Sequence, residues 1–321
     1  MSGVITWIYE AETVDPGEIE EFEQSIVERY ARLSRPRNLD FRLIRASELI
    51  ALCTDRPVLR YRGDDLLADP QCFIVEDMGT DPHSSHAAQA VYRTIHASDS
   101  VLLNRSMSGP DYLERDKLAF AQVASTLDVP VLPTIAVPYG KYARRALDEV
   151  TNEFGAGPYI IKPREMTSGI GVLRVNSRQE LGAAIDIASQ TSAGYIVQPY
   201  LPHAGDMRVY VADGKVVASL TRRPGQGSYL ASISQGGSIE TNEDHFLVAD
   251  HCMRIAQNLD AEWMCVDWLM TDEGPVLNEW CTANGGFTMV PEPQRTIVAD
   301  AFFGWIKTKL DAALAEPSQR R

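Results

Sequence analysis

The chain has 321 residues, of which 30 are Lys or Arg and 44 are Asp or Glu, so its formal net charge is −14. At roughly 100–200 residues per domain, this length predicts about two domains or one larger multi-lobed enzyme. The negative charge repels phosphate backbones, so we expect no sequence-independent binding to nucleic acid.

Three features of the sequence favour a cytoplasmic protein without membrane contact. No stretch approaches the roughly 20 uninterrupted apolar residues that span a bilayer. The first residues lack the basic and long apolar regions of a secretory signal. The five cysteines are an odd number, are widely spaced and include no C-x-x-C pair, which favours reduced thiols over a disulfide framework.

The first 105 residues alternate between strand and helix patterns. Residues 4–10 are rich in β-branched and aromatic side chains, which predicts a strand. Asp15-Pro16 then offers an N-cap and a first helical position, and apolar residues follow at helical spacing from Ile19 to Leu33. Further strands are predicted at 41–45, 72–76 and 101–103, with a helix at 86–96. This alternation is typical of a small α/β domain.

The remainder of the chain predicts an α+β arrangement with antiparallel hairpins. Helices are expected at 110–127, 178–190, 243–259 and 297–310, and strands at 159–162 and 195–198. A turn at Asp213-Gly214 joins predicted strands 207–212 and 215–220. A second turn at 272–274 joins predicted strands 264–270 and 275–280.

A lysine and a glycine-rich loop form the first candidate site. Lys162 follows an apolar strand and leads into the loop that contains Ser168, Gly169 and Gly171. Glycine lets backbone N–H groups approach oxyanions closely, so this segment can cradle triphosphate oxygens. Taken alone, the pattern also fits an ordinary turn between strands.

Two carboxylates form the second candidate site. Asp267 and Glu279 are equally distant from Glu273 in the predicted turn, so they can face each other across the hairpin. Facing carboxylates repel unless a cation lies between them, and oxygen ligands of this kind suit Mg²⁺. The alternative is a pair of unrelated acids on an exposed hairpin.

The order of these features, with Gln198-Pro199-Tyr200-Leu201 and Asp206-Met207-Arg208 between them, resembles the RimK-type (ribosomal-protein glutamate ligase-like) ATP-grasp ligases. Residues 277–288 are also similar to the corresponding segment of D-alanine–D-alanine ligases. The resemblance covers about residues 100–310. It implies an ATP-grasp fold with a preceding small α/β domain, and it divides the chain into an N-terminal α/β domain (1–105), a central subdomain with the Gly-rich loop (106–192) and a C-terminal subdomain with the metal site (193–315).

The resemblance also implies roles for individual residues. Asp267 and Glu279 would hold magnesium. Arg208 would face the reacting phosphoryl group, and Arg222 and Arg223 would meet the carboxylate substrate. The ATP-binding residues would be Lys117, Lys162, Thr167, Ser168, Gly169, Gly171, Gln198, Tyr200, Leu201 and Asp206.

One position departs from the family pattern. The family usually has Asn two residues after the metal-binding Glu, whereas this chain has Cys281. A neutral thiol is a poor ligand for Mg²⁺. Asn278, Asn284 or a water molecule would then supply the missing oxygen.

The activity implied by the resemblance is ATP-dependent ligation of a carboxylate to an amine. ATP converts the carboxylate into an acyl phosphate, an amine attacks it, and ADP and phosphate are released. The substrates would be amino acids or peptides, and family habit implies a homodimer. Two alternatives remain open: an ATP-grasp kinase that stops at phosphoryl transfer, and a non-catalytic module that binds a nucleotide or peptide.

Overall fold

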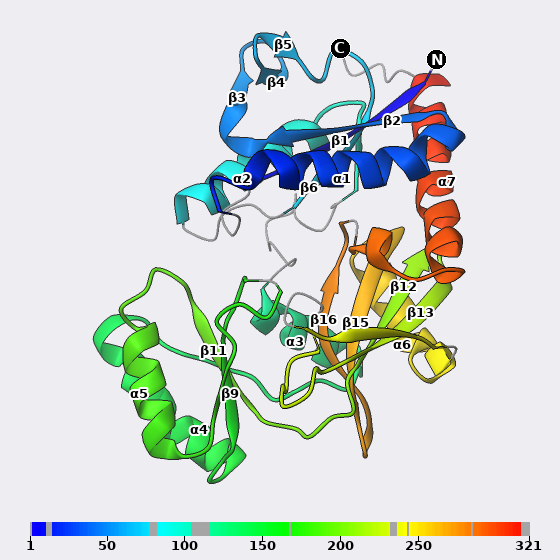
Figure 1. The fold of residues 1–321 in the computed structure, drawn as a ribbon. Coiled ribbons are helices and arrows are strands. Elements are labelled where there is room, and N and C mark those ends of the chain that lie inside the picture. Colours follow the sequence, from blue (N-terminus) through cyan, green and yellow to red (C-terminus); the bar gives the residue numbers. More distant parts are fainter. Residues whose placement is uncertain are drawn as a thin grey trace.

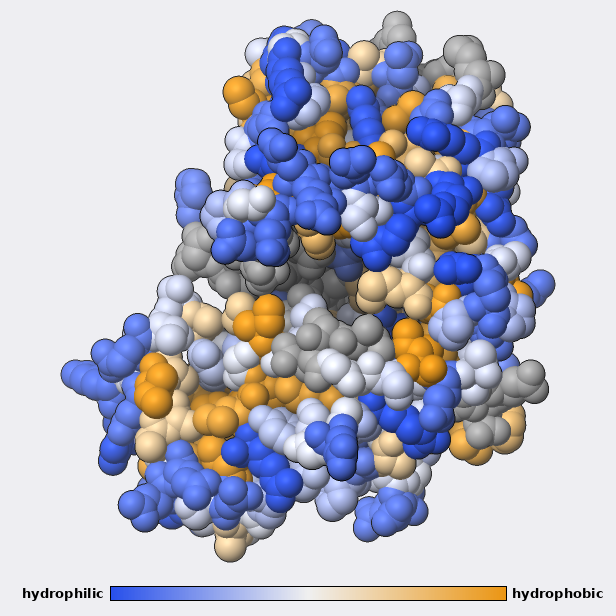
Figure 2. All heavy atoms as spheres, in the orientation of Figure 1, coloured by the Kyte–Doolittle hydropathy of each residue, from blue (hydrophilic) through white to orange (hydrophobic). Residues whose placement is uncertain are grey.

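The computed structural model describes residues 2–10, 15–76, 82–103, 116–166, 168–231, 236–242, 244–283 and 285–315. These residues form an N-terminal part (up to residue 103), a central lobe (135–199) and a C-terminal part (206–315, with residues 117–126 packed against it) (Figure 1). Figure 2 shows the same face hollowed between the N-terminal part and the other two. In the described residues no helix is long and apolar enough to cross a membrane.

The N-terminal part is built on a parallel sheet with the order β2-β1-β6-β7. Successive side chains of β1 point to opposite faces, which is why Trp7 packs with Tyr30 of α1 whereas Ile8 packs with Tyr92 of α2. This arrangement confirms the predicted α/β unit. Its elements are β1 (Gly3–Tyr9), α1 (Ile19–Ser34), β2 (Leu39–Arg45), β6 (Cys72–Val75), α2 (Pro82–His96) and β7 (Val101–Leu102).

Two details of the N-terminal part differ from the sequence prediction. Helix α1 begins at Ile19, because the side chain of Asp15 accepts a hydrogen bond from the Gly17 N–H at 2.8 Å and closes a separate turn. A small antiparallel sheet of short strands follows β2, and the sequence analysis did not anticipate it. Its strands are β3 (Leu49–Cys53), β4 (Pro57–Tyr61) and β5 (Asp64–Asp65).

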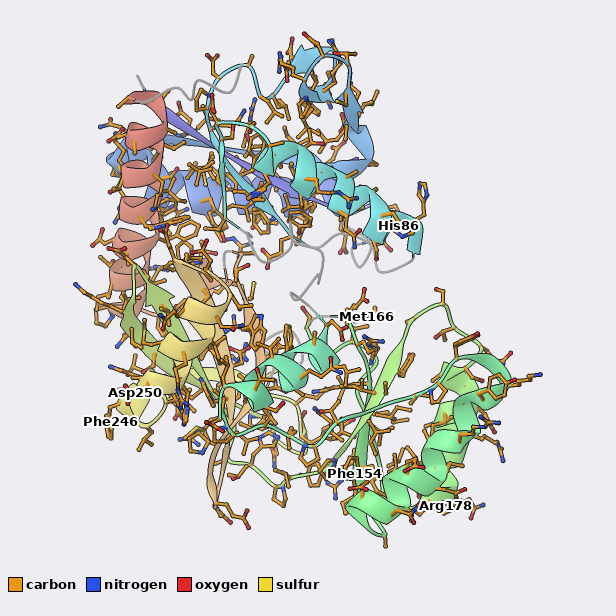
Figure 3. All side chains as sticks on the ribbon, turned by 180° about the vertical axis from the view of Figure 1, so that it is seen from behind. His86, Phe154, Met166, Arg178, Phe246 and Asp250 are labelled. Carbon is orange, nitrogen blue, oxygen red and sulfur yellow. The ribbon has the colours of Figure 1, made fainter. Side chains whose placement is uncertain are left out.

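The central lobe is an antiparallel sheet with the order β10-β9-β11-β8, covered by two helices. Figure 3 places Phe154 and Arg178 of these helices at the outer end of the lobe and Met166 on the side toward the N-terminal part. Helix α4 was not predicted. The elements are β8 (Ile135–Ala136), α4 (Ala146–Phe154), β9 (Tyr159–Pro163), β10 (Leu173–Val175), α5 (Arg178–Ala188) and β11 (Tyr195–Pro199).

The C-terminal part is an antiparallel sheet with the order β14-β13-β12-β15-β16. Helix α6 covers one face together with α3, whose Phe120 lies 4.5 Å from Trp280 between ring centroids. Helix α7 covers the other face. The elements are α3 (Lys117–Thr126), β12 (Asp206–Ala212), β13 (Lys215–Arg223), β14 (Ser238–Asn242), α6 (Ala249–Asn258), β15 (Trp263–Thr271), β16 (Gly274–Cys281) and α7 (Gln294–Ala315).

One hydrophobic core joins the N-terminal and C-terminal parts. It contains Trp7 and Tyr30 from the first, Trp263 from the C-terminal sheet, and Phe302 and Phe303 from α7. Helix α7 runs alongside both parts in Figure 1. Because they share this core, the N-terminal part is held in a fixed position against the sheet that carries the candidate metal ligands.

Candidate active site

A cavity of about 520 Å³ lies where the three parts meet. Its wall includes Trp7 and Tyr30 from the N-terminal part, Lys162 from the central lobe, and Asp267 and Glu279 from the C-terminal sheet. The cavity therefore gathers most of the residues that the sequence analysis singled out. A site at the junction of several parts is the usual location for a small-molecule pocket.

Asp267 and Glu279 are directly paired across the β15–β16 hairpin, as predicted. The route to this pairing differs from the symmetric count. The turn has two residues, because Thr271 pairs with Gly274, and an extra residue at Asn278 then shifts the register between Asp267 and Trp268. Such a bulge re-aims the side chains beside it. Asn278, Glu279 and Asp267 all line the cavity as a result.

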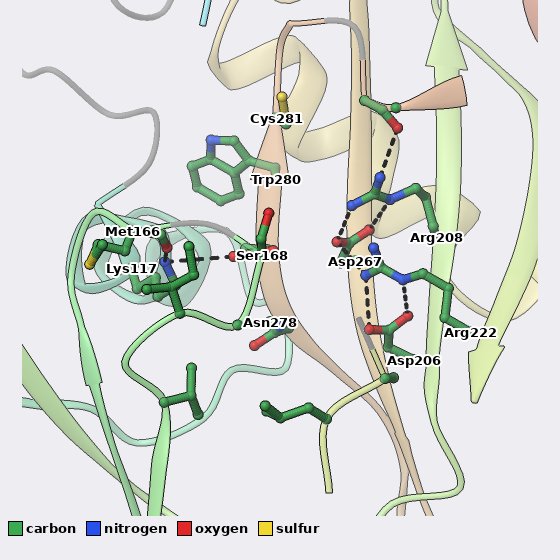
Figure 4. A pocket seen from close by; sticks show the side chains of 18 of the residues that line it. Lys117, Met166, Ser168, Asp206, Arg208, Arg222, Asp267, Asn278, Trp280 and Cys281 are labelled. Atoms are coloured by element: carbon green, nitrogen blue, oxygen red, sulfur yellow. Dashed lines mark hydrogen bonds and ion pairs between the residues drawn. The ribbon is translucent and has the colours of Figure 1, made fainter. Parts of the chain in front are cut away.

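Asp267 is held by two arginines. Arg208 donates to both of its carboxylate oxygens at 2.7 Å, and Arg222 donates to Oδ2 at 2.7 Å. Arg222 also donates two hydrogen bonds, of 2.6 and 2.8 Å, to the carboxylate oxygens of Asp206. These four side chains form one buried, internally neutral cluster on neighbouring strands (Figure 4). Bidentate pairs of this kind are the strong form of the ion pair.

The cluster sets the protonation of its acids. Burial raises the pKa of Asp267, but the charges of Arg208 and Arg222 outweigh it and lower the pKa to about 2. For Asp206, burial outweighs the attraction of Arg222, so its pKa is raised. Asp267 is therefore an anion throughout the physiological pH range.

This arrangement changes the sequence-based argument for a metal. That argument treated Asp267 and Glu279 as two uncompensated charges, whereas two arginines already neutralise Asp267. Lys117 lies 3.8 Å from Glu279. Like-charge repulsion alone therefore does not require a cation between the two acids.

The donor set nevertheless fits Mg²⁺. This ion usually takes one or two protein carboxylates and fills its octahedron with phosphate oxygens and water. Asp267 Oδ1 accepts one hydrogen bond from Arg208, so a lone pair remains for a ligand. Among the residues that the structure describes, no group of three or more His, Cys, Asp or Glu is arranged to hold a metal. Substrate phosphates and water would have to complete the coordination.

Two buried lysines, Lys117 and Lys162, lie beside strand β16 of the β15–β16 hairpin. Lys117 opens α3 and donates from Nζ to the Met166 carbonyl oxygen at 2.6 Å. Lys162 near the end of β9 donates to Asn278 Oδ1 at 3.3 Å. Each residue is only 7% exposed. Both ammonium groups therefore flank Glu279 at the inner end of the cavity.

The surroundings of Lys162 disfavour its charged form. Burial and, to a lesser extent, the neighbouring Lys117 lower its pKa to about 8, although the charge of Glu279 acts in the opposite direction. A buried lysine beside a second lysine needs an anion. A polyphosphate satisfies both charges.

The glycine-rich loop borders the cavity beside these lysines. Ser168 and Gly169 line it, and both have positive φ values of 59° and 75°. Gly171 also has a positive φ of 71°, and a Cβ there would lie 2.8 Å from Pro163 Cγ. The absence of a side chain at Gly171 therefore lets the loop pack closely against Pro163. Thr167 lies outside the described residues.

The segment 198–201, predicted to bind ATP and which we call the hinge, forms another section of the cavity wall. Gln198, Tyr200 and Leu201 all line it. The Gln198 side chain donates to Thr134 Oγ1 at 2.8 Å, and the Tyr200 N–H donates to the Pro158 carbonyl oxygen at 2.9 Å. These bonds fix the hinge against the central lobe.

The structure separates the two arginines predicted to meet the carboxylate substrate. Arg222 lines the cavity, whereas Arg223 pairs with Glu240 at 2.6 Å on the exposed side of the sheet. Adjacent residues of a strand point to opposite faces, so both cannot enter one cavity. Only Arg222 is in a position to meet a ligand there.

Several cavity residues were not found from the sequence. Asn278 was considered only as a spare oxygen ligand, and its side chain contacts Lys162 instead. Glu76 follows β6, and its Oε1 lies 3.6 Å from the Sγ of Cys281. Arg29 of α1 also reaches the wall. The acid after a parallel strand was the available signal for Glu76, since ligands collect at such strand ends. Asn284 lies outside the described part of the chain.

The comparison with known families is decisive. Residues 115–306 match the sequence model of the RimK-like ATP-grasp domain. The chain belongs to the RimK-like ATP-grasp family. A probable alpha-L-glutamate ligase 2 of Pseudoalteromonas atlantica is 27% identical over 238 residues, which cover 71% of this chain and 73% of that protein. This membership, predicted from the ordered motifs, makes the chain an ATP-dependent carboxylate–amine ligase.

Solved structures share the fold of this ligase. The D-alanyl-alanine synthetase A of Vibrio cholerae has a TM-score of 0.69 and 14% identity, with 98% of this chain and 99% of that chain covered. The ATP-grasp ligase PsnB, in a complex with a precursor variant, Mg and ADP, has a TM-score of 0.59 and 16% identity, with 99% and 100% covered. At these identities the likeness concerns the fold alone.

Proposed function

We propose that this RimK-like ligase activates a substrate carboxylate with ATP and passes the acyl group to an amine, so that an amide, ADP and phosphate are formed. The observation that carries the proposal is the placement of Lys117 and Lys162 opposite the paired Asp267 and Glu279 in one cavity. Phosphoryl transfer depends mostly on positioning and charge neutralisation, and these groups supply both.

The charges of the site favour a polyphosphate at its inner end. The cluster of Asp206, Asp267, Arg208 and Arg222 is neutral within itself. Lys117 and Lys162 then outnumber Glu279 by one positive charge at the place where the glycine-rich loop meets the hairpin. ATP would lie with its phosphates between the lysines and its adenine toward Gln198, Tyr200 and Leu201, and Asp206 would be the acid nearest to its ribose.

Asp267 and Glu279 would hold Mg²⁺, which supplies charge neutralisation between their carboxylates and the nucleotide phosphates. Use of ATP with Mg²⁺ is a property of the family, and a relative of the same fold that holds Mg and ADP supports it here. The protein's own contribution is to fix both acids, one by arginines and the other beside Lys117.

Arg208 and Arg222 are the groups that orient the reacting carboxylate and phosphoryl oxygens in this proposal. Their guanidinium groups line the cavity but are held by Asp267 and Asp206. A guanidinium has five donors, so each arginine keeps N–H groups for a substrate oxygen while bound to its acid. Arg223 has no part in this step. The loop 168–171 would exclude water, because an acyl phosphate hydrolyses readily.

The substrates we propose are amino acids or peptides. This rests on two similar proteins, one of which is named a probable alpha-L-glutamate ligase and the other of which, the ATP-grasp ligase PsnB, is solved in a complex with a precursor peptide. A cytoplasmic location and a homodimer remain parts of the proposal. All five cysteines are free thiols, in line with a reducing compartment.

The test is an ADP-release screen with purified protein, ATP and Mg²⁺ against pools of amino acids and short peptides, with mass spectrometry of the products. A ligase gives an amide mass and ADP release that requires both a carboxylate and an amine. ADP release that persists without an amine, together with a stable phosphorylated product, indicates the kinase. Nucleotide binding without turnover in every pool indicates the binding module.

A further inference from the structure

The N-terminal part contributes a distinct section of the cavity wall, which no motif of the ligase family predicted for this sequence. Phe22, Ile26 and Arg29 lie at positions i, i+4 and i+7 of α1, so they share one face of the helix. All three line the cavity. Together with Tyr30 and Glu76 they form what we call the N-terminal subsite.

The subsite carries one charge of each sign. Glu76 Oε1 lies 3.6 Å from the Sγ of Cys281, and Cys281 is two residues beyond Glu279 on β16. Arg29 lies on α1. Its Nε donates to the Ser25 carbonyl oxygen at 3.3 Å, and no acid among the described residues forms an ion pair with it. A partly buried guanidinium without an acid suits an anionic ligand group.

The subsite also contains a buried hydroxyl. Tyr30 is 2% exposed, and its hydroxyl has no hydrogen-bond partner within the described part of the chain. Burial raises its pKa, the charges of Glu76 and Tyr210 add to this effect, and Arg29 opposes it. Buried polar groups are normally paired, so an unpaired one beside a cavity points to a polar ligand.

The surface around the charges is apolar. Ile26 and Phe22 form one side, and Met289 and Ile239 from the C-terminal part also line the cavity. Phe22 is 36% exposed and Met289 is 51% exposed, so apolar surface is available to a ligand. Burying a ligand's apolar side chain here would remove both surfaces from water.

We infer that the N-terminal subsite binds the amine substrate, and that this substrate is an amino acid with an apolar side chain and a free carboxylate. Arg29 pairs with the carboxylate, Phe22 and Ile26 contact the side chain, and Glu76 faces the ammonium group. The amine then points inward, toward Glu279 and the site of acyl transfer. This inference rests on the proposed function and narrows its substrate class.

An acidic side chain fits the subsite less well. Within the described residues the subsite offers a single cation, Arg29, and the α-carboxylate of the ligand occupies it. A second carboxylate would enter apolar surface near Glu76 without a partner, which is unfavourable. The subsite thus favours leucine-like or phenylalanine-like amines over glutamate.

The test is equilibrium binding of single amino acids in the presence of Mg²⁺ and a non-hydrolysable ATP analogue. We expect L-phenylalanine to bind at least tenfold more tightly than L-glutamate and about tenfold more tightly than phenylalaninamide, which lacks the carboxylate. Arg29→Gln should weaken L-phenylalanine about tenfold and leave phenylalaninamide within twofold. Arg32→Gln is the matched control, because Arg32 lies exposed on the same helix and does not line the cavity.

A second variant tests the apolar contact. Phe22→Ala should reduce the preference for L-phenylalanine over L-alanine, without changing the loss on amidation. Tighter binding of glutamate, equal weakening of phenylalanine and its amide by Arg29→Gln, or no binding of any amino acid would overturn the inference. Amide and ADP formation with an acidic amine would overturn the inference and leave the proposed function standing. Phenylalanine binding with the expected selectivity but without ADP release in any substrate pool would contradict the proposed function and leave the amino-acid specificity of the subsite standing.

Discussion

The Nζ of Lys162 lies 3.3 Å from the Oδ1 of Asn278, and this contact joins the central lobe to the C-terminal sheet at the bottom of the cavity. It depends on the bulge in β16, which inserts Asn278 between residues that pair with β15. The same bulge brings Glu279 opposite Asp267. One irregularity in a strand thus fixes both the lysine that would meet phosphate and the acids that would meet magnesium.

Replacing Lys162 with an apolar residue should raise the stability of the protein and abolish its activity. A pKa lowered from 10.5 to about 8 corresponds to roughly 3 kcal/mol of burial cost for the charged lysine. Lys162→Met should therefore raise the free energy of unfolding at pH 7, by up to that amount, and abolish ADP release. Urea unfolding and the ADP assay check this. Lys215→Met, on an exposed turn, is the control and should change neither quantity.

The pKa of Lys162 also predicts two pH dependences. Below about pH 8 the lysine is charged in the folded protein, so kcat/KM for ATP should fall as the pH rises through 8. The unfolded chain keeps the proton up to about pH 10.4. Between these values the unfolded state binds more protons, so the contribution of Lys162 to stability rises with pH. A flat kcat/KM profile through pH 8 would contradict the assignment.

Asp267→Asn and Glu279→Gln should behave differently although the two acids face each other. Loss of the Asp267 charge leaves Arg208 buried without its acid and leaves Arg222 with Asp206 alone, which should cost about 3–5 kcal/mol of stability. Glu279 is about one third exposed and 3.8 Å from Lys117, so Glu279→Gln should cost about 1 kcal/mol or less. Both variants should lose most of their ADP release. Equal stability losses in thermal or urea unfolding would show that the arginine cluster does not hold Asp267 as described.

Cys281→Asn should leave the fold intact and lower the Mg²⁺ concentration needed for half-maximal ADP release several-fold. An amide oxygen binds Mg²⁺ better than a neutral thiol. It can also accept the Ala283 N–H that now contacts Sγ at 3.3 Å. Cys53→Asn, at an exposed cysteine, is the control. An unchanged Mg²⁺ titration with full activity would mean that residue 281 lies outside the coordination sphere.

Gly171→Ala should impair turnover more than its backbone conformation alone explains. Gly171 has a φ of 71°, and Gly155 has a φ of 75° with a ψ of −148°, so alanine strains both backbones by about 1 kcal/mol or more and strains Gly155 at least as much as Gly171. At Gly171 the added Cβ also meets Pro163 Cγ at 2.8 Å, whereas nothing lies within 4 Å at Gly155. ADP release should fall at least tenfold for Gly171→Ala and stay near the wild-type rate for Gly155→Ala. Equal rates of ADP release in the two variants would show that the close packing of Gly171 against Pro163 is not needed for turnover.

Local patterns predicted the elements that the site needs. Lys162 at a strand end, the loop at 168–171 and the β15–β16 hairpin follow from spacing and turn chemistry, whereas the pairing of Asp267 with Glu279 also depends on a bulge that the spacing did not indicate. The order of these motifs along the chain identified the family. Periodicity missed the short strands β3 to β5, because strands of two to five residues give too little alternation to detect.

Interactions between distant segments could not be predicted in this way. The pairing of Arg222 with Asp206 and Asp267 depends on the register of three strands, and the sequence gives no signal for which charges meet across them. The family resemblance grouped Arg223 with Arg222, yet strand alternation points these adjacent residues apart. Glu76 reaches Cys281 only because a shared core fixes the N-terminal part against the C-terminal sheet.

The most direct measurement of the central claim is the transfer of ¹⁸O from the substrate carboxylate to phosphate, with a substrate pair found in the ADP-release screen. An acyl phosphate forms when a carboxylate oxygen attacks the γ-phosphorus and ADP leaves. Attack by the amine then breaks the C–O bond, so the labelled oxygen departs with the phosphate. We predict one ¹⁸O in phosphate for each amide formed. Unlabelled phosphate in a reaction that yields the amide would contradict the account.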